Sequence, residues 1–160
     1  MRAADKECIS CQAISGAKRM NEVPRVMVTT NWVVEHIFPT SIRGWMVMMP
    51  KRHVTAVHQL TRAEMAEFGE LLHAVCEGFH ELYGAEKEYF MQFSEAPGFT
   101  HLDVHVVPRL KDWPSELTGE NLFISKKYQT ENLLTPHEAA EEAMKLQNYL
   151  LKKVPARLMK

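Results

Sequence analysis

The sequence predicts an α+β fold, in which a mostly antiparallel sheet packs against one long helix and a C-terminal helix. Strand-like segments lie on both sides of a long helical pattern, and a second helical pattern closes the chain. Because the strands are grouped and do not alternate strictly with helices, they favour antiparallel pairing. The 160 residues fit a single domain, 1–160, with a core over about residues 8–125 and a helical extension over about 135–153.

The first strands are predicted to form a hairpin that is followed by a short buried strand. Segments 25–29 and 32–37 are rich in Val, Ile and Trp, and the polar residues between them can form the turn. Residues 45–49 are apolar, and Pro50 is expected to end that strand. The chain before the hairpin, up to residue 22, is polar and contains glycine, so no helix is predicted there.

The long helix has the clearest pattern in the chain. Thr61 and Glu64 have the spacing of a capping box, in which each side chain binds the backbone amide of the other residue. Gly84 lies where a C-terminal cap is expected. Between these caps, apolar residues recur at spacings of three and four, which predicts one buried stripe. The stripe consists of Met65, Phe68, Leu72, Val75, Phe79 and Leu82.

A strand, a central segment, a loop region and a final helix follow the long helix. Residues 88–94 are predicted as a strand, and a turn then leads into the segment 101–109. Residues 109–134 carry Pro, Gly and scattered charge, so mostly irregular structure is expected there. The last helix begins at Thr135, an N-cap residue that precedes Pro136. Its apolar face consists of Ala139, Ala143, Leu146 and Leu150.

The segment from His101 to Arg109 is the centre of the functional prediction. His101, Asp103 and His105 alternate with apolar residues, which is the pattern of a half-buried strand. Side chains two residues apart project from the same face, so two imidazoles and a carboxylate are predicted in one row. Titratable groups packed into an apolar core would each need a partner. The row therefore indicates a lined pocket or a metal site, with an exposed polar sheet face as the alternative.

Cys8 and Cys11 form a Cys-x-x-Cys pair, which can supply two ligands to one zinc ion. A closed tetrahedral site needs two further ligands. The candidates are His53, which follows a predicted strand, and His101, which begins the central segment. The alternatives are a redox pair, for which the flanking strand and helix are missing from the pattern, and idle thiols beside a loop histidine. Cys76 in the long helix is interpreted as a small core residue.

Composition argues against several classes of partner. The formal net charge is −1 and the pI is about 6.7, so electrostatic binding to nucleic acid or to an anionic membrane is not expected. No apolar run approaches the ~20 residues of a membrane span, and the first residues lack the apolar stretch of a signal peptide. Three cysteines, two of them in the Cys-x-x-Cys pair, fit a reducing compartment, so a cytoplasmic protein is expected.

Two motifs resemble the histidine-triad (HIT) family. The spacing His101-x-Asp103-x-His105 is similar to the His-x-His-x-His signature of that family, and Pro50 to Val54 resembles the strand exit of its members. The resemblance covers residues 8–125 and is closest to bacterial members with an N-terminal Cys-x-x-Cys pair. These members, and the related galactose-1-phosphate uridylyltransferases, hold a structural zinc ion. The resemblance implies that its ligands here are Cys8, Cys11, His53 and His101.

For function, the resemblance implies binding of a nucleotide or dinucleotide and cleavage or transfer at its α-phosphate. The middle triad residue, here Asp103, attacks the phosphorus and forms a covalent nucleotidyl intermediate, which water or another acceptor then releases. The last triad residue, His105, supports the phosphate oxygens together with backbone amides. The resemblance also implies a homodimer joined through a strand and the long helix, and a chemical step in which no metal takes part.

The sequence departs from the family pattern at several positions. Asp103 replaces the nucleophilic histidine, and an aspartate is a much weaker base that also brings negative charge to an anionic phosphate. His36 replaces an acidic ribose-binding residue, and Gly44-Trp45 replaces a Gly-His pair. Pro97-Gly98 replaces a phosphate-binding Gln-Ser/Thr pair. The specificity for the nucleoside therefore does not transfer from the family.

Four hypotheses follow from these residues. The first is a working nucleotide hydrolase or nucleotidyl transferase in which Asp103, or a water molecule that it activates, replaces the histidine. The second is a catalytically impaired nucleotide-binding protein. The third is a structural domain stabilised by zinc and without a ligand. The fourth is an inactivated variant, because a single-base codon change converts His to Asp.

Overall fold

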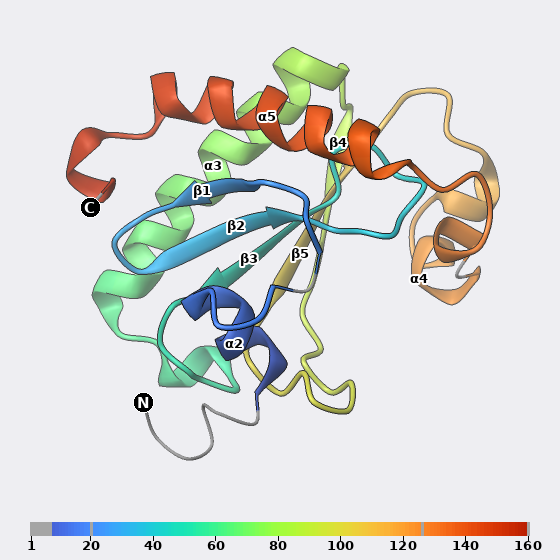
Figure 1. Ribbon diagram of the computed structural model, residues 1–160. Coiled ribbons are helices and arrows are strands. Elements are labelled where there is room, and N and C mark those ends of the chain that lie inside the picture. The colour runs from blue at the N-terminus through green and yellow to red at the C-terminus, as the bar shows by residue number, and fades with distance from the viewer. Residues whose placement is uncertain (1–7, 20, 126, 160) are drawn as a thin grey trace.

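The computed structural model describes residues 8–19, 21–125 and 127–159. Five strands form one sheet in the order β1-β2-β3-β5-β4, and every neighbouring pair is antiparallel (Figure 1). The α+β prediction is therefore confirmed. The strands are β1 (Arg25–Val28), β2 (Trp32–His36), β3 (Met46–Pro50), β4 (Lys87–Met91) and β5 (Val104–Arg109), and the helices are α2 (Ile9–Ser15), α3 (Arg62–Tyr83), α4 (Asn121–Ser125) and α5 (Pro136–Lys153).

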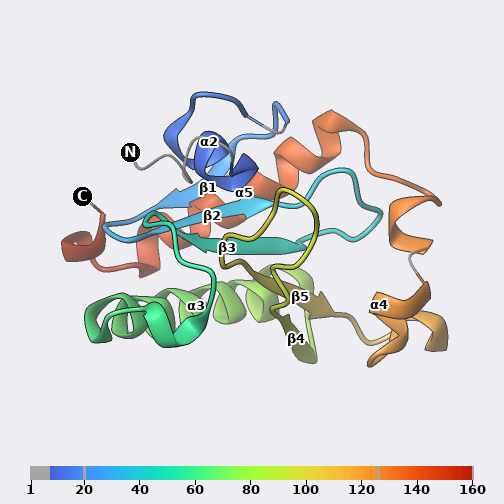
Figure 2. The same cartoon turned by 90° about the horizontal axis from the view of Figure 1, so that it is seen from below.

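Helices α3 and α5 cover one face of the sheet, and α2 lies on the other (Figure 2). Because side chains alternate along a strand, every second residue of β2, β3 and β5 points into the core beneath α3 and α5. This leaves the opposite face of the same strands for polar groups. The buried core residues are Trp32, Val34, Met46, Met48 and Val106 from the sheet, Leu71, Val75 and Phe79 from α3, and Ala139, Ala143, Leu146 and Leu150 from α5.

The two long helices begin and end where the sequence predicts. The Thr61 side chain accepts a hydrogen bond from the Glu64 amide, and the Glu64 side chain accepts one from the Thr61 amide. Gly84 ends α3 in the left-handed conformation, at a φ of 64°. Helix α5 has the same capping box at Thr135 and Glu138. Each box binds two amides that the first helical turn leaves without a partner, so both helix starts are defined locally.

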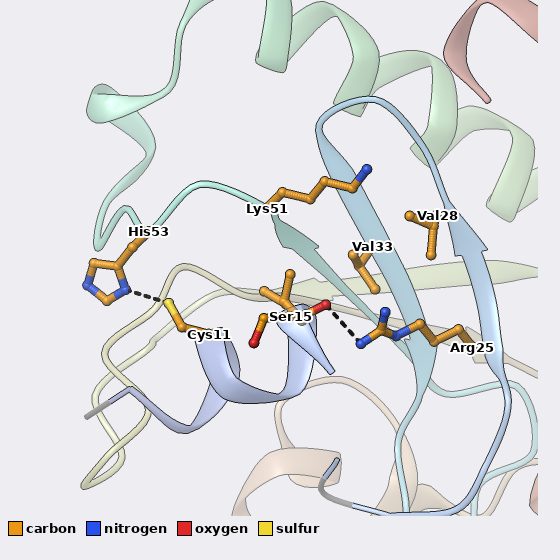
Figure 3. Close-up of a pocket in the computed structure, with 8 residues that line it drawn as sticks. Cys11, Ser15, Arg25, Val28, Val33, Lys51 and His53 are labelled. Atoms are coloured by element: carbon orange, nitrogen blue, oxygen red, sulfur yellow. Dashed lines mark hydrogen bonds between the residues drawn. The ribbon is translucent and has the colours of Figure 1, made fainter. Parts of the chain in front are cut away.

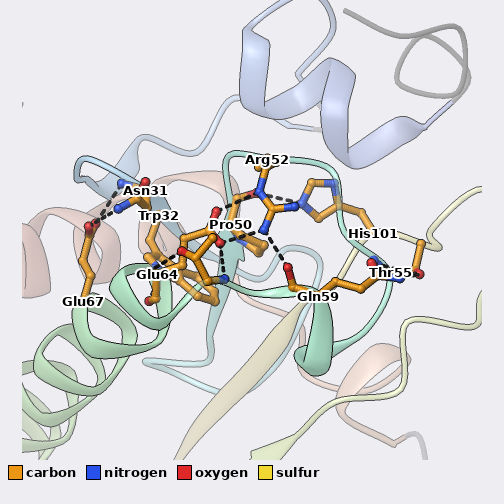
Figure 4. Close-up of polar contacts among 10 residues, drawn as sticks. Asn31, Trp32, Pro50, Arg52, Thr55, Gln59, Glu64, Glu67 and His101 are labelled. Carbon is orange, nitrogen blue, oxygen red and sulfur yellow. Dashed lines mark hydrogen bonds and ion pairs between the residues drawn. The ribbon is translucent and has the colours of Figure 1, made fainter.

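The buried face of α3 is rotated relative to the predicted stripe. Met65, the first predicted stripe residue, is 39% exposed, whereas Leu71 outside the stripe is fully buried. The reason is that Glu64 and Glu67 occupy the first inward positions. The Glu67 carboxylate accepts hydrogen bonds from the backbone amide of Asn31 at 2.8 Å and from its side chain at 2.6 Å (Figure 4). Glu64 and Glu67 are polar residues that the sequence pattern places outside the buried stripe, but both carboxylates face inward and are fully hydrogen-bonded.

The predicted hairpin is confirmed by β1 and β2, and the third strand ends at Pro50 as predicted, although Pro50 itself belongs to the strand. It is the last residue of β3 and pairs with Trp32 at the near end of β2. Proline is tolerated at this strand end because it lacks only an N–H donor. Residues 109–134, predicted as mostly irregular, contain α4 and two short 3-10 turns. Within the described residues, the 3-10 turns are Val57–Gln59, Ser115–Leu117, Lys127–Gln129 and Ala156–Leu158.

The two strands β4 and β5 are both shorter than predicted. β4 ends at Met91, and β5 begins only at Val104, so His101 and Asp103 precede the strand. The backbone explains the late start, because the Leu102 amide donates to the Val54 carbonyl at 2.7 Å and so joins a loop. The predicted strand from residue 101 is therefore wrong over its first three residues.

A second, smaller hydrophobic cluster lies on the sheet face opposite α3. Trp45 and Val107 of the sheet region pack there against Leu122 and Tyr128. The rings of Trp45 and Tyr128 have centroids 4.5 Å apart. The segment after β5 thus covers part of the face that carries the functional groups. Among the described residues, no helix has both the length and the apolar character needed to cross a membrane.

Candidate metal and active site

Four side chains from three separate segments of the chain meet beside the sheet. Cys8 and Cys11 come from the start of α2, His53 from the loop after β3, and His101 from the loop before β5. Their ligand atoms all lie within 4.8 Å of one another. Cys11 Sγ is 3.2 Å from His53 Nδ1 (Figure 3), and it is 3.3 Å from His101 Nδ1. Tetrahedral zinc bonds of ~2.3 Å to sulfur and ~2.0 Å to nitrogen separate such atoms by about 3.5 Å, so these residues fit a metal ion.

The ring of His101 is oriented for this role by the backbone. His101 is fully buried, and its Nε2–H donates to the Pro50 carbonyl at 2.7 Å. Since a carbonyl only accepts hydrogen bonds, Nε2 carries the proton and Nδ1 presents its lone pair toward Cys11. A ligand histidine commonly has its second ring nitrogen bound in this way, which fixes the tautomer and the ring plane.

Helix α2 brings the two cysteines together and was missed by the sequence analysis. Cys8 is its N-cap residue, and the Cys11 amide donates to Cys8 Sγ at 3.4 Å. A helix of seven residues is too short for a clear apolar period, which is why the pattern did not reveal it. The helix supplies part of the context of a redox pair. However, two imidazole nitrogens directed at one thiol favour metal binding over a redox pair.

The loop that carries His53 is attached to α3 by an ion pair. The Arg52 guanidinium donates to both carboxylate oxygens of Glu64, at 3.0 and 2.7 Å, and to the Gln59 carbonyl at 2.8 Å (Figure 4). The hydrogen bond from Arg52 holds the pKa of Glu64 at about 2, although burial opposes this shift. The buried Glu64 carboxylate is therefore ionised, and it fixes the position of the residue next to His53.

The opposite end of α2 is held by an arginine from the sheet. Arg25 donates through Nη2 to the Ala13 and Ile14 carbonyls and pairs through Nε with Glu35 at 2.8 Å. Positive charge at a helix C-terminus is favourable, because the last carbonyls have no partner within the helix. Between this arginine and the metal ligands lies a cavity of about 320 Å³ (Figure 3). Its lining consists of Cys11, Ile14, Ser15, Arg25, Val28, Val33, Lys51 and His53.

Asp103 and His105 form a second polar group next to the metal ligands. His105 Nε2 lies 3.3 Å from Asp103 Oδ2, and their side chains are 22% and 19% exposed. The indole Nε1–H of Trp45 donates to His105 Nδ1 at 3.0 Å. A nitrogen that accepts this bond carries no proton, so the neutral ring has its proton on Nε2, facing the carboxylate. Asp103 and His105 thus lie together, whereas His101 departs from their row and joins the candidate metal ligands.

Two residues of the preceding loop complete this group and were not found from the sequence. Ser94 Oγ donates to Asp103 Oδ1 at 2.6 Å and accepts from the Asp103 amide at 3.1 Å. Gln92 Nε2 donates to the same Ser94 oxygen at 2.9 Å. Ser94 has a φ of 54°, a left-handed conformation that is uncommon for residues other than glycine. Nothing in the sequence signals this contact, because Ser94 was assigned to a strand.

Asp103 and His36 both depart from the family pattern, and the pKa of each side chain is lowered for a different reason. Burial opposes ionisation of Asp103, but hydrogen bonds from His105 and Ser94 outweigh it, so the pKa of the carboxyl lies below its ordinary value. Burial lowers the pKa of His36 to about 4. His36 follows Trp32 and Val34 in alternation on β2 and therefore faces the helices, away from Asp103. It thus does not contribute to the site.

Comparison with known proteins supports the fold. No family model matches the sequence. The galactose-1-phosphate uridylyltransferase of Thermotoga maritima is 30% identical over 106 residues, which cover 58% of this chain and 31% of that protein. The chain therefore spans about a third of the length of this curated relative.

Solved structures of histidine-triad proteins superpose over nearly the whole chain. A hypothetical histidine triad nucleotide-binding protein from Sulfolobus tokodaii has a TM-score of 0.67 and 15% identity, with 91% of this chain and 93% of that chain covered. A zinc-bound histidine triad family protein from Mycobacterium smegmatis has a TM-score of 0.65 and 16% identity, with 92% and 96% covered. The chain therefore has the fold of histidine-triad proteins.

Proposed function

We propose that this protein is a member of the histidine-triad family that binds a nucleotide or dinucleotide and cleaves or transfers it at the α-phosphate. The observation that carries the proposal is the Asp103–His105 pair, which lies partly exposed directly after the candidate metal ligand His101. The segment has the spacing of the family signature and leads into β5 of a sheet with the family's fold. The uridylyltransferase similarity supports the same class of chemistry.

In the proposed reaction, Asp103 Oδ2 forms a bond to the α-phosphorus, and the bond from that phosphorus to the leaving group breaks. The leaving group departs with the electron pair, and an amine leaving group takes a proton from solvent. His105 Nε2–H can donate a hydrogen bond to a phosphate oxygen at this stage. Water then adds to the phosphorus and releases the carboxylate, the nucleoside monophosphate and a proton to solvent. Asp103 can alternatively act as the base that orients this water.

Asp103 makes this reaction slower than an imidazole would. An ionised carboxylate repels an anionic phosphate by about 1 kcal/mol at ~4 Å in water and by about 4 kcal/mol at an effective dielectric constant of 20. The measured rate should therefore be lower than the rate of the Asp103→His variant, in which a neutral ring replaces the charged carboxylate.

The metal in this proposal is a structural zinc ion held by Cys8, Cys11, His53 and His101. When bound, it supplies folding stability at the junction of three chain segments. Binding of the ion fixes the position of His101. Because Asp103 follows only two residues later in the chain, its position is restricted as well. The reaction described above uses only Asp103, His105 and water.

A homodimer and a cytoplasmic location belong to the same proposal. β4 is an edge strand of the sheet; Phe90 within it is 53% exposed, and Phe93 just after it is 67% exposed. An exposed edge with large apolar side chains can pair with a second copy and extend the sheet. Static light scattering on the purified chain would distinguish one copy from two.

The second candidate function is a nucleotide-binding protein with impaired catalysis. Each side-chain oxygen of Asp103 and each ring nitrogen of His105 has a partner within the protein. An attack by Asp103 must exchange some of these hydrogen bonds for contacts to the substrate. Whether the aspartate is natural or introduced, a self-contained pair of this kind favours binding without turnover.

The discriminating experiment compares the chain with Asp103→His on adenosine phosphoramidate and diadenosine polyphosphates, with release of nucleoside monophosphate as the readout. We expect slow turnover by the chain itself and a rate about 5- to 1,000-fold higher for Asp103→His, from the 1–4 kcal/mol of repulsion removed. Asp112→His, at an exposed aspartate, is the matched control.

The outcomes separate the two candidates. Turnover only after the substitution supports the impaired binding protein. The absence of turnover in both forms, together with no binding of nucleoside monophosphate by calorimetry, would overturn both functions. A covalent intermediate on Asp103 would be an acyl phosphate, which hydroxylamine cleaves, and its absence during turnover would favour the role of Asp103 as a base.

A further inference from the structure

We infer that Ser94 is a positioning residue that selects Asp103 Oδ2 as the reactive oxygen, by binding the other oxygen and the backbone amide of Asp103. This inference rests on the proposed function and names a residue of the same site that lies outside the signature. The evidence comes from the loop between β4 and β5, in which Gln92 and Ser94 face Asp103.

The hydrogen bonds of Ser94 determine the direction of its hydroxyl proton. A serine hydroxyl has one proton to donate and two lone pairs to accept with. Ser94 Oγ accepts from the Asp103 amide at 3.1 Å and from Gln92 Nε2 at 2.9 Å, which uses both lone pairs. The remaining proton points to Asp103 Oδ1 at 2.6 Å. Ser94 therefore contacts Asp103 at two points, and these contacts restrict the rotation of its side chain.

This arrangement leaves the two carboxylate oxygens in different states. Oδ1 accepts the short bond from Ser94, whereas Oδ2 faces His105 Nε2 at the longer distance of 3.3 Å. The oxygen with the weaker bond is the one that can turn to a phosphorus atom at the least cost in lost hydrogen bonding. Ser94 thus assigns the anchoring role to Oδ1 and the reacting role to Oδ2.

The backbone of Ser94 supports a functional reading of this contact. A φ of 54° at a residue other than glycine or asparagine has a conformational cost, and such residues are concentrated at sites where geometry is part of the function. A glycine at this position would relieve that cost. The serine therefore retains a hydroxyl at a place where its backbone would favour a residue with no side chain.

The test uses Ser94→Gly in the full chain, because glycine accepts this backbone conformation while the hydroxyl is removed. We expect kcat to fall about 10- to 100-fold, the effect typical of a lost supporting contact or of a displacement of about 1 Å, while KM changes less than about threefold. We expect the melting temperature to stay the same or to rise. Gln92→Ala should produce a smaller fall in kcat, since Ser94 keeps both bonds to Asp103. Glu95→Gln, on the same loop and exposed, is the control.

A second readout does not depend on turnover. In a ¹H–¹⁵N spectrum, Ser94→Gly should shift the His105 ring nitrogens, because Asp103 is free to rotate away from Nε2. The indole of Trp32, which donates to the Glu64 carbonyl on the other face of the sheet, should not shift. Unchanged kcat in an active protein, or unchanged His105 resonances, would overturn the inference. If the unsubstituted chain shows no turnover but the His105 resonances shift, the proposed function fails and the contact to Asp103 stands.

Discussion

The cluster of four candidate metal ligands and the Asp103–His105 pair lie almost next to each other in the chain but are built in opposite ways. His101 is fully buried and joins ligands from two other segments, whereas the side chains of Asp103 and His105 are about one-fifth exposed. The four candidate ligands come from distant parts of the chain. Asp103 and His105, in contrast, contact each other and Ser94 of the loop between β4 and β5. Under the proposed function, one alternating motif serves structure at its first residue and chemistry at the next two.

The backbone between the two regions produces the difference. Leu102 donates to Val54 and so attaches His101 to the loop that carries His53. From Val104 onward the chain is part of the sheet, and His105 lies on the open face. A variant should therefore affect either stability and metal content or catalysis, depending on which side of this junction it changes.

The largest effect is expected from breaking the metal cluster. Cys11→Ala, or removal of the ion with a chelator, should destabilise the protein by more than about 4 kcal/mol, because structural zinc contributes roughly 10–16 kcal/mol in small peptides. Elemental analysis should find one zinc per chain in the unsubstituted protein and none in the variant. Cys76→Ala is the matched control, since this cysteine lies on α3 outside the cluster. A chain with no zinc and unchanged thermal unfolding would refute the metal assignment.

A smaller effect is expected from the ion pair beside His53. Glu64 has a pKa of about 2 in the folded protein and 4.5 in the unfolded chain, so its contribution is complete above pH 4.5. As the pH falls toward 2, the unfolded chain takes up the proton first and the contribution is lost. The shift corresponds to about 2 kcal/mol, after a discount for the exposure of Arg52.

Chemical denaturation as a function of pH measures this contribution. Glu64→Gln should be about 2 kcal/mol less stable than the unsubstituted chain at pH 7 and should show a flatter decline in stability below pH 4.5. Glu77→Gln on the same helix, at an exposed residue 3.8 Å from Lys153, should change stability by at most a few tenths of a kcal/mol. Equal pH profiles for the two variants would contradict the role of Glu64.

The smallest effect on stability is expected on the side of the Asp103–His105 pair. Trp45→Phe keeps an aromatic ring in the second hydrophobic cluster but removes the donor to His105 Nδ1. The loss of one neutral hydrogen bond should cost about 1 kcal/mol. The ¹⁵N shifts of His105 should show a mixture of the two tautomers, while the zinc content remains unchanged. A single unchanged tautomer would mean that Asp103 alone orients the ring.

Local features of the sequence determined much of this molecule. The capping box at Thr61, the N-cap at Thr135, the hairpin and the α+β class were predicted from the sequence pattern, and the structure confirms them. The four residues Cys8, Cys11, His53 and His101 were named from their chemistry and from the family resemblance, and they converge in space. Metal-ligating side chains belong to a few rare residue types and occur at recognisable spacings, so candidate ligands can be found from the sequence alone.

Only the tertiary structure decided the rest. Helix α2 is too short to show a period, and its position depends on Arg25 and Glu35 from the sheet. The inward carboxylates of α3 look solvent-exposed in the sequence, because Arg52, which binds Glu64, and Thr29, which binds Glu67, are 12 and 38 residues away. Ser94 acquires its contact to Asp103 from a loop conformation that no local pattern encodes. Hydrogen bonds between distant segments depend on where the packed elements bring the chain, and that position is a property of the whole fold.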